Sequence, residues 1–583
     1  AIVGGSLLAA CGGDDDDDDD GGETPAASGE TPAAGGGATA TTASSGGSSS
    51  PSTGSPEAEA TSSGGSAPVG MTPVAELADE QVMRLPSGEP NTMDPGVSFG
   101  GDELDIMFNI FDGVTGVDQQ TGEIVPRVAE TYEGNADGSE YTFNLRTGLQ
   151  WSDGTPMNAN DFVYSWKRVL DPNTKSQYMP ALYSIKGAQE AAESGAGFED
   201  IGVEAVDDNT LKVTLVGPTP YFPLLTTTWT FYPVPKHIID DKGDAWVEAE
   251  NIVSNGPFIL TSWDHNQEMI LEQNPNFYGD TPTLTRAEYR LFDDPVSQAY
   301  VSFENDELDY AQVTGADVDR AMGDADASKN LLTFSLSNCN FVVCDTSNPP
   351  TDQKPFRQAL SMAISRETLT GQVLKGQFDP AYTILAPDIK GNNPDASIGE
   401  DVDKAKSLLT DAGIDDPGSV EIELVYISTP ARNKTVAEYL QATWNKNLGI
   451  EVKLTPIEST AYSDWRASRE TQKYNTYTGS WGSDFSDASN WFNQNFTHAA
   501  DHYRNHYNNP DFDSLVEEAA VNTDEAEREQ QYKDAEVIIV DDAPIIPLYR
   551  SKAFRAIKPY VKNLFLQPIL SVVHLRTVQI EKH

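Results

Sequence analysis

The stretch VEIELVYISTPARNKTVAEYLQATWNKNLGIEVKLTPI, residues 420–457, decides the fold class. Residues 420–426 and 450–457 have the apolar pattern of short strands, and residues 431–448 between them predict a helix. A strand, a helix and a strand in this order indicate a parallel β-α-β unit. We therefore expect a mixed α/β protein.

The first half of the chain is richer in predicted strands. Residues 141–146 and 211–215 alternate between apolar and polar side chains, as strands do. Residues 158–170 predict a helix with its apolar side chains on one face. Asn158 is placed to cap this helix, and Asp161 three residues later completes a pattern that resembles a capping box.

Two further helices are predicted in the second half of the chain. The first covers Phe356–Val373, and the second covers Val402–Ala412. The second is followed by Gly413, a residue suited to the left-handed conformation that often ends a helix.

Size and charge limit the possible functions. The chain has 583 residues, which fits two to four domains. It carries 91 Asp and Glu residues against 38 Lys and Arg residues, a formal net charge of −53. Such a charge repels nucleic-acid phosphates, so we expect no nucleic-acid partner.

The N-terminus resembles the end of a lipoprotein signal. Leu8-Ala9-Ala10-Cys11 has the order leucine, two small residues and cysteine, which implies cleavage before Cys11 and lipidation of its thiol. Residues 12–75 are rich in Gly, Ser, Thr, Ala and Pro and contain a run of seven Asp residues. This composition predicts a disordered tether. No apolar run of membrane-spanning length follows it.

A series of motifs resembles the bacterial extracellular solute-binding proteins of family 5, the peptide-binding group. The densest match is Trp151-Ser-Asp-Gly-Thr-Pro-Met-Asn-Ala-Asn-Asp-Phe-Val-Tyr-Ser-Trp166. The other motifs occur along the chain in the same order as in the family. They include Asn91-Thr-Met-Asp-Pro95, Asn109-Ile-Phe-Asp-Gly-Val114, Pro126-Arg-Val-Ala-Glu130, Asn255-Gly-Pro-Phe258 and Phe356-Arg-Gln-Ala-Leu360. Within the family, the oligopeptide-binding members are the most similar, through residues 169–178, 481–485 and 580–583.

The resemblance implies a bilobal periplasmic-binding-protein fold of class II. Two lobes joined by a hinge would enclose a ligand cleft, and an extra domain would lie beside the first lobe. The expected boundaries are 1–11 for the signal remnant, 12–75 for the tether, 76–117 with 226–332 and 550–583 for a discontinuous lobe I, 118–225 for the extra subdomain, and 333–549 for lobe II.

A receptor for peptides of varied sequence must bind the ammonium group and the backbone of its ligand. An extended backbone is satisfied by strand-like pairing, and a buried carboxylate offsets the desolvation of an ammonium group. The resemblance implies that Asp484 pairs with the ligand ammonium group. It also places Trp481 and Gly482 on the strand that pairs with the ligand backbone, and Ser483 beside them among the ligand contacts. The alternative for Trp481 is an ordinary core position.

Other expected ligand contacts also come from the resemblance. Tyr178 and Phe341 correspond to aromatic residues of the cleft, and Phe99 and Gly101 to an early loop that touches the ligand. Arg466 and Arg432 lie near positions that meet the peptide carboxylate. The chain departs from its relatives in two places, because an acidic residue expected near Phe99 is absent and a threonine replaces an arginine near Thr478.

The sequence thus predicts an extracytoplasmic, lipid-anchored substrate-binding protein of an ABC importer. It would be a monomer that captures oligopeptides, closes its lobes around them and delivers them to the permease. No cofactor and no metal are expected. The alternatives are a receptor of the same family for a dipeptide, a nickel complex or an oligosaccharide, and an extracytoplasmic hydrolase. No Gly-x-Ser-x-Gly, phosphate-loop or His-Glu-x-x-His motif supports an enzyme.

Two side-chain patterns leave alternatives open. His498, His502 and His506 would share one face of a helix near metal-ligand distance, but the stretch also resembles a family loop. Cys339 and Cys344 would form a disulfide only if a turn brought them together. In one continuous strand they would be roughly 16 Å apart, beyond the reach of a disulfide.

Overall fold

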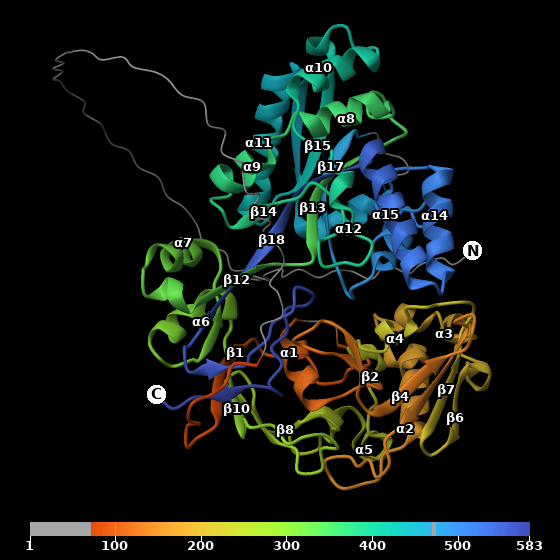
Figure 1. The fold of residues 1–583 in the computed structure, drawn as a ribbon, viewed down its shortest axis with the longest axis vertical. Coiled ribbons are helices and arrows are strands. Elements are labelled where there is room, and N and C mark those ends of the chain that lie inside the picture. Colours follow the sequence, from red (N-terminus) through yellow and green to blue (C-terminus); the bar gives the residue numbers. More distant parts are fainter. Residues whose placement is uncertain (1–70, 99–100, 469–473) are drawn as a thin grey trace, which may run out of the picture. The chain divides into compact units, whose positions relative to one another are not determined.

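The computed structural model describes residues 71–98, 101–468 and 474–583 (Figure 1). The predictions for Cys11, for most of the tether and for Phe99 lie outside these residues. Within them, the backbone N–H groups of Thr72 and Ala75 donate to Asn563 Oδ1 at 2.7 Å and Glu581 Oε1 at 3.2 Å. The folded part of the chain therefore begins at or before Thr72.

Two four-stranded sheets, one mixed and one antiparallel, are built from the first half of the chain. One sheet has the order β1-β10-β9-β8. β1 Val82–Ser87 is parallel to β10 Arg286–Leu291. β9 Glu268–Gln273 is antiparallel to β10 and to β8 Phe258–Asp264. The other has the order β4-β5-β7-β6, from β4 Ala129–Gly134, β5 Glu140–Leu145, β7 Thr210–Thr214 and β6 Val203–Asp207. The strands predicted around residues 141–146 and 211–215 are confirmed.

Helix α2, Ala159–Leu170, packs against β6 and β7. The Asn158 side chain accepts from a backbone N–H of the first turn, and the Asp161 side chain accepts from the Asn158 N–H at 2.8 Å. The predicted capping box is therefore present. Trp166 lies on the buried face, and its Nε1 donates to the Phe231 carbonyl oxygen at 2.8 Å.

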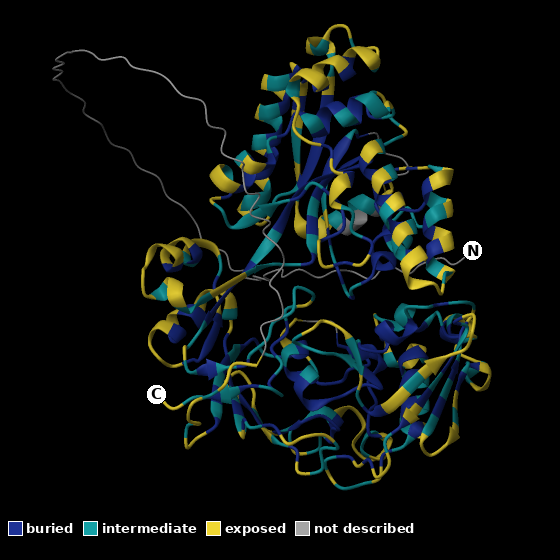
Figure 2. Ribbon diagram, viewed as in Figure 1, coloured by how far each residue is buried: buried dark blue, intermediate teal, exposed yellow. Residues whose placement is uncertain are grey.

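The largest sheet belongs to the second half of the chain and has the order β11-β18-β13-β17-β15-β16. Strands β15 Glu421–Ile427 and β16 Glu451–Ile457 are parallel, and α11 Ala431–Leu448 connects them. The predicted β-α-β unit is confirmed. The other strands are β11 Tyr310–Gln312, β13 Asn338–Cys344, β17 Thr476–Gly482 and β18 Ile545–Ile557. Figure 2 shows buried residues along the strands of this sheet and exposed ones on α10 and α14.

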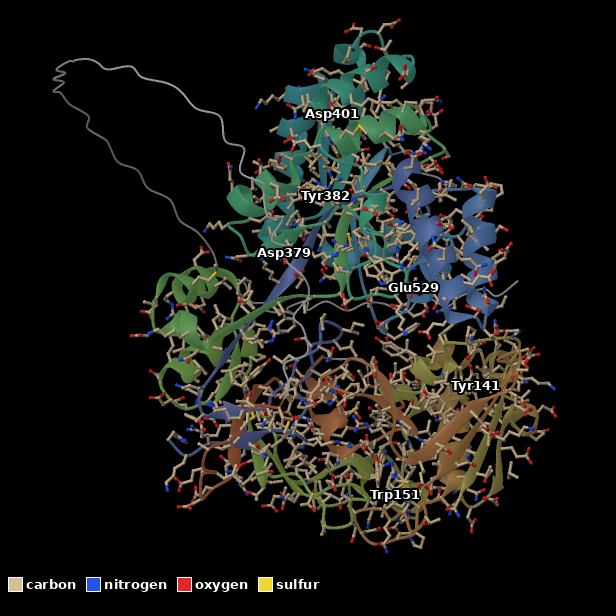
Figure 3. The ribbon with its side chains drawn as sticks, in the orientation of Figure 1. Tyr141, Trp151, Asp379, Tyr382, Asp401 and Glu529 are labelled. Atoms are coloured by element: carbon tan, nitrogen blue, oxygen red, sulfur yellow. The ribbon has the colours of Figure 1, made fainter. Side chains whose placement is uncertain are left out.

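Strand β18 runs for 13 residues and pairs with four strands. Its first part pairs with β13, and its last part with β11 and with β12 Leu331–Ser335. In between lies β14 Phe378–Pro380, which carries Asp379 (Figure 3). Asp379 forms an ion pair with Lys552 of β18 at 2.7 Å and accepts from Ser335 Oγ. β18 therefore belongs both to the large sheet and to a small core made by α6, α7 and β11.

The remaining helices cover these sheets. They are α1 Gly101–Ile110, α3 Ala188–Ser194, α4 Phe222–Leu225, α5 Lys236–Lys242, α6 Pro295–Glu304, α7 Gly315–Gly323, α8 Lys354–Met362, α9 Arg366–Thr368, α10 Val402–Asp411, α12 Ser459–Ala467, α13 Phe492–Asn495, α14 Pro510–Val521 and α15 Glu525–Asp542. The short pairs β2 Thr115–Val117 with β3 Ile124–Pro126 and β19 Val561–Lys562 with β20 Gln579–Ile580 complete the strands. No helix in the described ranges has the length and apolarity needed to cross a bilayer.

The helix predicted over Phe356–Val373 is wrong as a single element. α8 ends at Met362, and α9 and a π-helical turn at Leu369–Val373 follow after a break. The buried guanidinium of Arg366 donates to the carbonyl oxygens of Pro547 and Ser361 at 2.8 and 3.3 Å. The Arg366 side chain thus adds a donor to a carbonyl oxygen in the last turn of α8, which also accepts from the Ile364 N–H at 3.3 Å. The predicted end of α10 is confirmed, because Gly413 has a φ of +77°.

The possible disulfide between Cys339 and Cys344 is also wrong. Both thiols are free and fully buried. They stand at the two ends of the continuous strand β13, and the turn needed to join them does not form. Burial raises the pKa of Cys339 to about 11 and that of Cys344 to about 12, so both thiols stay protonated and unreactive near neutral pH.

This arrangement predicts the thiol count of the protein. In a Cys11→Ala variant that was never reduced, we expect Ellman's reagent to find no reactive thiol in the native state and two in guanidinium chloride. Detection of no thiol in the denatured, unreduced protein would show that a disulfide exists.

Candidate functional site

The candidate site begins at the carboxyl ends of the parallel strands β15 and β17, an edge where open α/β sheets bind ligands. Within the described residues, thirteen buried side-chain N and O atoms lack a hydrogen-bond partner. Five lie on or just after these two strands: Ser428 Oγ, Arg432 Nε, Trp481 Nε1, Ser489 Oγ and Asn495 Oδ1. Because buried polar groups are normally paired, we infer that this edge is suited to a polar ligand.

Strand β17 has a partly unpaired edge. β13 pairs with β17 along its whole length, from Asn338 opposite Gly482 to Cys344 opposite Thr476. On the other side of β17, β15 pairs only with Thr476 and Tyr477. Residues 478–482 of β17 therefore have a strand partner on one side only in the described part of the chain. An extended ligand backbone can pair with such an edge.

Asp484 follows this edge directly and is partly buried. Its backbone N–H donates to Asn490 Oδ1 at 2.9 Å, and Asn490 Nδ2 donates to Asp484 Oδ2 at 3.0 Å. Within the described ranges, no Lys, Arg or His forms an ion pair with it. Burial raises the pKa of Asp484 to about 6, although the hydrogen bond from Asn490 opposes the shift. The site thus holds a carboxylate without a counter-charge.

The loop of residues 483–491, called the Asp484 loop below, is closed by its own contacts. Trp491 Nε1 donates to Ser483 Oγ at 2.8 Å. Asp487 accepts from the Ser489 N–H at 2.9 Å and caps a single 3-10 turn, Ala488–Asn490. The Arg528 guanidinium binds both oxygens of Asp487 at 2.6 Å. These contacts fix the loop in the absence of a ligand.

Two tyrosines from the first half of the chain lie near the Asp484 loop. Burial raises the pKa of Tyr178 to about 12, and the charge of Asp484 contributes to this shift. The Tyr178 ring packs edge-on against Trp229, with 4.9 Å between the ring centroids. Tyr221 stacks on Phe485 at 6.3 Å between centroids and lies below the Arg528 guanidinium at 5.4 Å. The predicted residues Tyr178 and Asp484 are therefore close enough for the charge of Asp484 to act on Tyr178.

Trp481, Gly482 and Ser483 lie where β17 enters the loop. Trp481 is 4% exposed, and its ring packs against His502 with 5.5 Å between centroids. Its indole N–H has no partner, so this residue combines a core position with an open donor. The Ser483 N–H donates to the Ser337 carbonyl oxygen at 2.9 Å, which extends the ladder with β13 into the loop.

Phe341 does not line the site, and this part of the prediction is corrected. It is fully buried on β13 and packs edge-on against Tyr503, with 5.3 Å between centroids. Its partner across the ladder is Gly479, where an added Cβ would lie 2.9 Å from the Phe341 ring. The glycine leaves space for the ring inside the core. Gly101 is exposed as the first residue of α1, and Phe99 lies outside the described residues.

The two predicted arginines lie at the same sheet edge and differ in their partners. Arg466 on α12 donates from Nη1 to His502 Nε2 at 2.9 Å. Burial, Arg466 and Arg504 lower the pKa of His502 to about 3, so its imidazole is neutral and accepts this bond. Arg432 on α11 lies over the Phe378 ring at 5.0 Å, and its Nε has no partner. Neither arginine forms an ion pair with a described carboxylate.

The three histidines do not form a metal site. Residues 496–509 contain no helix, so His498, His502 and His506 are not stacked on one face. His506 Nδ1 lies 3.2 Å from Asp345 Oδ1, and His498 Nδ1 lies 3.3 Å from the Tyr507 carbonyl oxygen. Within the described ranges, no group of three His, Cys, Asp or Glu side chains has metal-binding geometry.

Sequence reasoning missed Ser428, Asn490 and Arg528. Ser428 follows directly after the predicted strand 420–426, and residues after parallel strands form the ligand-binding edge, so its position was a usable signal. Asn490 and Arg528 carry no such signal. They act through Asp484 and Asp487, and that pairing becomes visible only in three dimensions.

Comparison with known proteins gives similarities over almost all of the described chain. The family described as "Bacterial extracellular solute-binding proteins, family 5 Middle" matches residues 123–503. The "Probable deoxycholate-binding periplasmic protein YgiS" of Escherichia coli is 32% identical over 519 residues, covering 87% of this chain and 95% of YgiS. The "Periplasmic oligopeptide-binding protein OppA" of E. coli is 31% identical, covering 88% of this chain and 95% of OppA.

A solved structure, "MppA Periplasmic Murein Tripeptide Binding Protein, Unliganded Open Form", superimposes with a TM-score of 0.77 at 29% identity, covering 87% of this chain and 99% of MppA. The expected periplasmic-binding-protein fold is thereby confirmed. Proteins of this family bind solutes for transport and are not enzymes. The chain belongs to the bacterial extracellular solute-binding proteins, family 5.

Proposed function

We propose that this chain captures oligopeptides outside the cytoplasm and delivers them to the permease of an ABC importer. The observation that carries the proposal is the carboxylate of Asp484, which has no counter-charge and stands at the end of the unpaired edge of β17. A peptide supplies both missing partners, because it has a cationic end followed by a row of backbone N–H and C=O groups. Two of the similar proteins described above are named for peptide binding.

The ammonium group of the ligand would bind Asp484. A charge-assisted hydrogen bond in a partly buried site is stronger than one between neutral groups. Its positive charge would also offset the desolvation that raises the pKa of Asp484. The ligand backbone would pair with residues 478–482, and Tyr178 would cover the amino end.

The acidic end of the ligand would meet an arginine. Arg466 and Arg432 both lie near the carboxyl ends of the parallel strands and have no carboxylate partner among the described residues. In a chain with 91 acidic residues, arginines without such a partner are suited to a ligand carboxylate. We assign Arg466 and Arg432 to the terminal carboxylates of ligands that differ in length.

The expected domain boundaries fit this proposal. Lobe II would be 333–549, and β18 would carry the chain back into lobe I, so that closing motions bend the strands β12 and β18. Lipidation of Cys11 would anchor the protein, and residues 12–75 would let it reach the permease as a monomer.

A carboxylate-bearing apolar solute is the second candidate. Arg432 lies over the Phe378 ring, a pairing of cation and apolar surface that suits such a ligand, and YgiS is named as a probable deoxycholate-binding protein. Mass spectrometry of ligand released from freshly purified protein separates the two candidates. A mixture of short peptides supports the first, and a single steroid acid, sugar or metal complex contradicts it.

Substitution of Asp484 tests the amine contact. We expect Asp484→Asn to weaken binding of trialanine by at least tenfold at pH 7.5, because the ammonium group loses its counter-charge while remaining desolvated. Binding of N-acetyl-trialanine should change little. Isothermal titration calorimetry measures both affinities.

Glu517→Gln on the exposed face of α14 is the control, since it removes the same charge from a solvent-exposed side chain. Equal losses for the free and the acetylated peptide in Asp484→Asn would contradict the assignment of the amine contact to Asp484.

The raised pKa of Asp484 predicts a cost in stability for the ligand-free protein. The folded state binds this proton more tightly than the unfolded state, because the pKa rises from 3.8 to about 6. The cost is therefore absent below about pH 4, grows as the pH rises to 6, and reaches up to about 3 kcal/mol above that. Asp484→Asn should raise the urea midpoint at pH 7.5 and leave it unchanged at pH 4. An increase of the same size at both pH values would disprove this account.

A further inference from the structure

The Asp484 loop holds its carboxylate in one orientation. We propose that Asn490 is the positioning residue that fixes the Asp484 carboxylate and leaves one oxygen open for a primary ammonium group. This inference rests on the proposed function and adds to it the reason why the site distinguishes a free amino end.

Asn490 contacts Asp484 at two points. Its Oδ1 accepts from the Asp484 backbone N–H at 2.9 Å, and its Nδ2 donates to Asp484 Oδ2 at 3.0 Å. One side chain therefore ties the carboxylate to its own backbone, so that rotation of the Asp484 side chain breaks a hydrogen bond. Asp484 Oδ1 has no hydrogen bond within the described ranges and is the oxygen left open for a ligand.

Asn490 is itself held by contacts that do not involve Asp484. It is fully buried, and its Nδ2 also donates to Gln494 Oε1 at 3.0 Å. Its backbone N–H donates to the Asp487 carbonyl oxygen at 3.1 Å, and its carbonyl oxygen accepts from Asn495 Nδ2 at 3.1 Å. The Arg528 guanidinium fixes Asp487. The position of Asn490 is therefore set by the protein before any ligand arrives.

The same contact determines the charge of the site. Burial favours protonated Asp484, and the hydrogen bond from Asn490 favours the ionised form. Burial and the charge of Asp484 keep the Tyr178 hydroxyl neutral. Asp487 of the loop and Arg528 of α15 neutralise each other. Asn490 is thus the group that keeps Asp484 ionised enough to bind a cation.

The occupied Oδ2 also restricts the shape of the cation. A guanidinium group gains most from a carboxylate when it binds both oxygens, whereas an ammonium group needs one. With Oδ2 taken by Asn490, the site favours a primary ammonium group over a guanidinium group. It also disfavours an N-acylated end, which brings no charge.

Three variants test the role of Asn490 by calorimetry with trialanine and N-acetyl-trialanine between pH 5 and 8. Asn490→Ala should weaken binding of trialanine about tenfold at pH 7.5, the loss of one charge-assisted hydrogen bond. It should also move the pH midpoint of trialanine binding upward. Asn490→Asp should move that midpoint further, because two carboxylates 3.0 Å apart share a proton. Neither should change binding of the acetylated peptide.

Asn493→Ala is the matched control. It removes another asparagine of the same segment, one that bonds the Val516 carbonyl oxygen and the Tyr532 hydroxyl but neither Asp484 nor Asn490. We expect it to lower the urea midpoint while keeping the wild-type ratio of the two peptide affinities and the wild-type pH midpoint. The ratio and the midpoint therefore separate positioning of the carboxylate from a general loss of stability.

The ligand-free protein gives a second readout. The stability difference between each Asn490 variant and its Asp484→Asn double mutant, measured in urea from pH 4 to 8, reports the titration of Asp484 without any peptide. In Asn490→Ala its midpoint should lie above that of the wild type. An unchanged midpoint together with an unchanged affinity ratio overturns the role of Asn490. If Asp484→Asn itself leaves the affinity ratio unchanged, the amine contact fails, and the proposed function with it.

Discussion

The hydrogen-bond ladder of strand β18 is the constraint on which the structure depends. A strand in a folded protein must pair its backbone groups, and β18 does so with β13, β14, β12 and β11 in succession. Its side chains belong to two cores, with Ile545, Ile546 and Leu548 in one and Phe554 and Ala556 in the other. β13 pairs with β17 and so places the edge that carries Asp484.

Buried charge is used in two different ways within a few residues. Asp487 is neutralised by Arg528 through two bonds of 2.6 Å, and this pair maintains the shape of the loop. Asp484 receives only an amide and keeps a raised pKa. A buried ion pair is already neutralised within the protein, whereas an uncompensated carboxylate favours a ligand that brings the missing charge. The loop thus combines a fixed backbone with one carboxylate that has no counter-charge among the described residues.

Local sequence patterns were sufficient for much of the fold. The capping box at Asn158 and the left-handed end at Gly413 depend on neighbouring residues, and both formed as predicted. The helix over 356–373 failed because the buried Arg366 bonds Pro547, which is 181 residues away and has no signature in the local pattern. The disulfide between Cys339 and Cys344 depended on a local turn, and this turn does not form because β13 continues as one strand through these residues.

The candidate site also contains residues that the sequence could predict and residues that it could not. The family resemblance pointed to Asp484 and Tyr178, which are close enough for the Asp484 charge to act on Tyr178, and to Phe341, which belongs to the core. Resemblance transfers a position along the chain but not the direction of its side chain. Phe341 faces Gly479 across the ladder, and that pairing decides its environment. Asn490 was out of reach, since its importance lies in a contact with a residue six positions earlier across a turn.

The closed loop between Ser483 and Trp491 has a consequence for the thermodynamics of recognition. A binding segment that orders only around its ligand loses conformational entropy at that moment and gives up affinity. Here the segment is ordered by its own tryptophan, serine and ion pair, so the entropy was lost when the chain folded. The remaining entropic penalty is the conformational entropy that the flexible ligand loses. Longer ligands would then gain contacts at a steadily increasing cost in conformational entropy, which favours ligands that are short or already stiff.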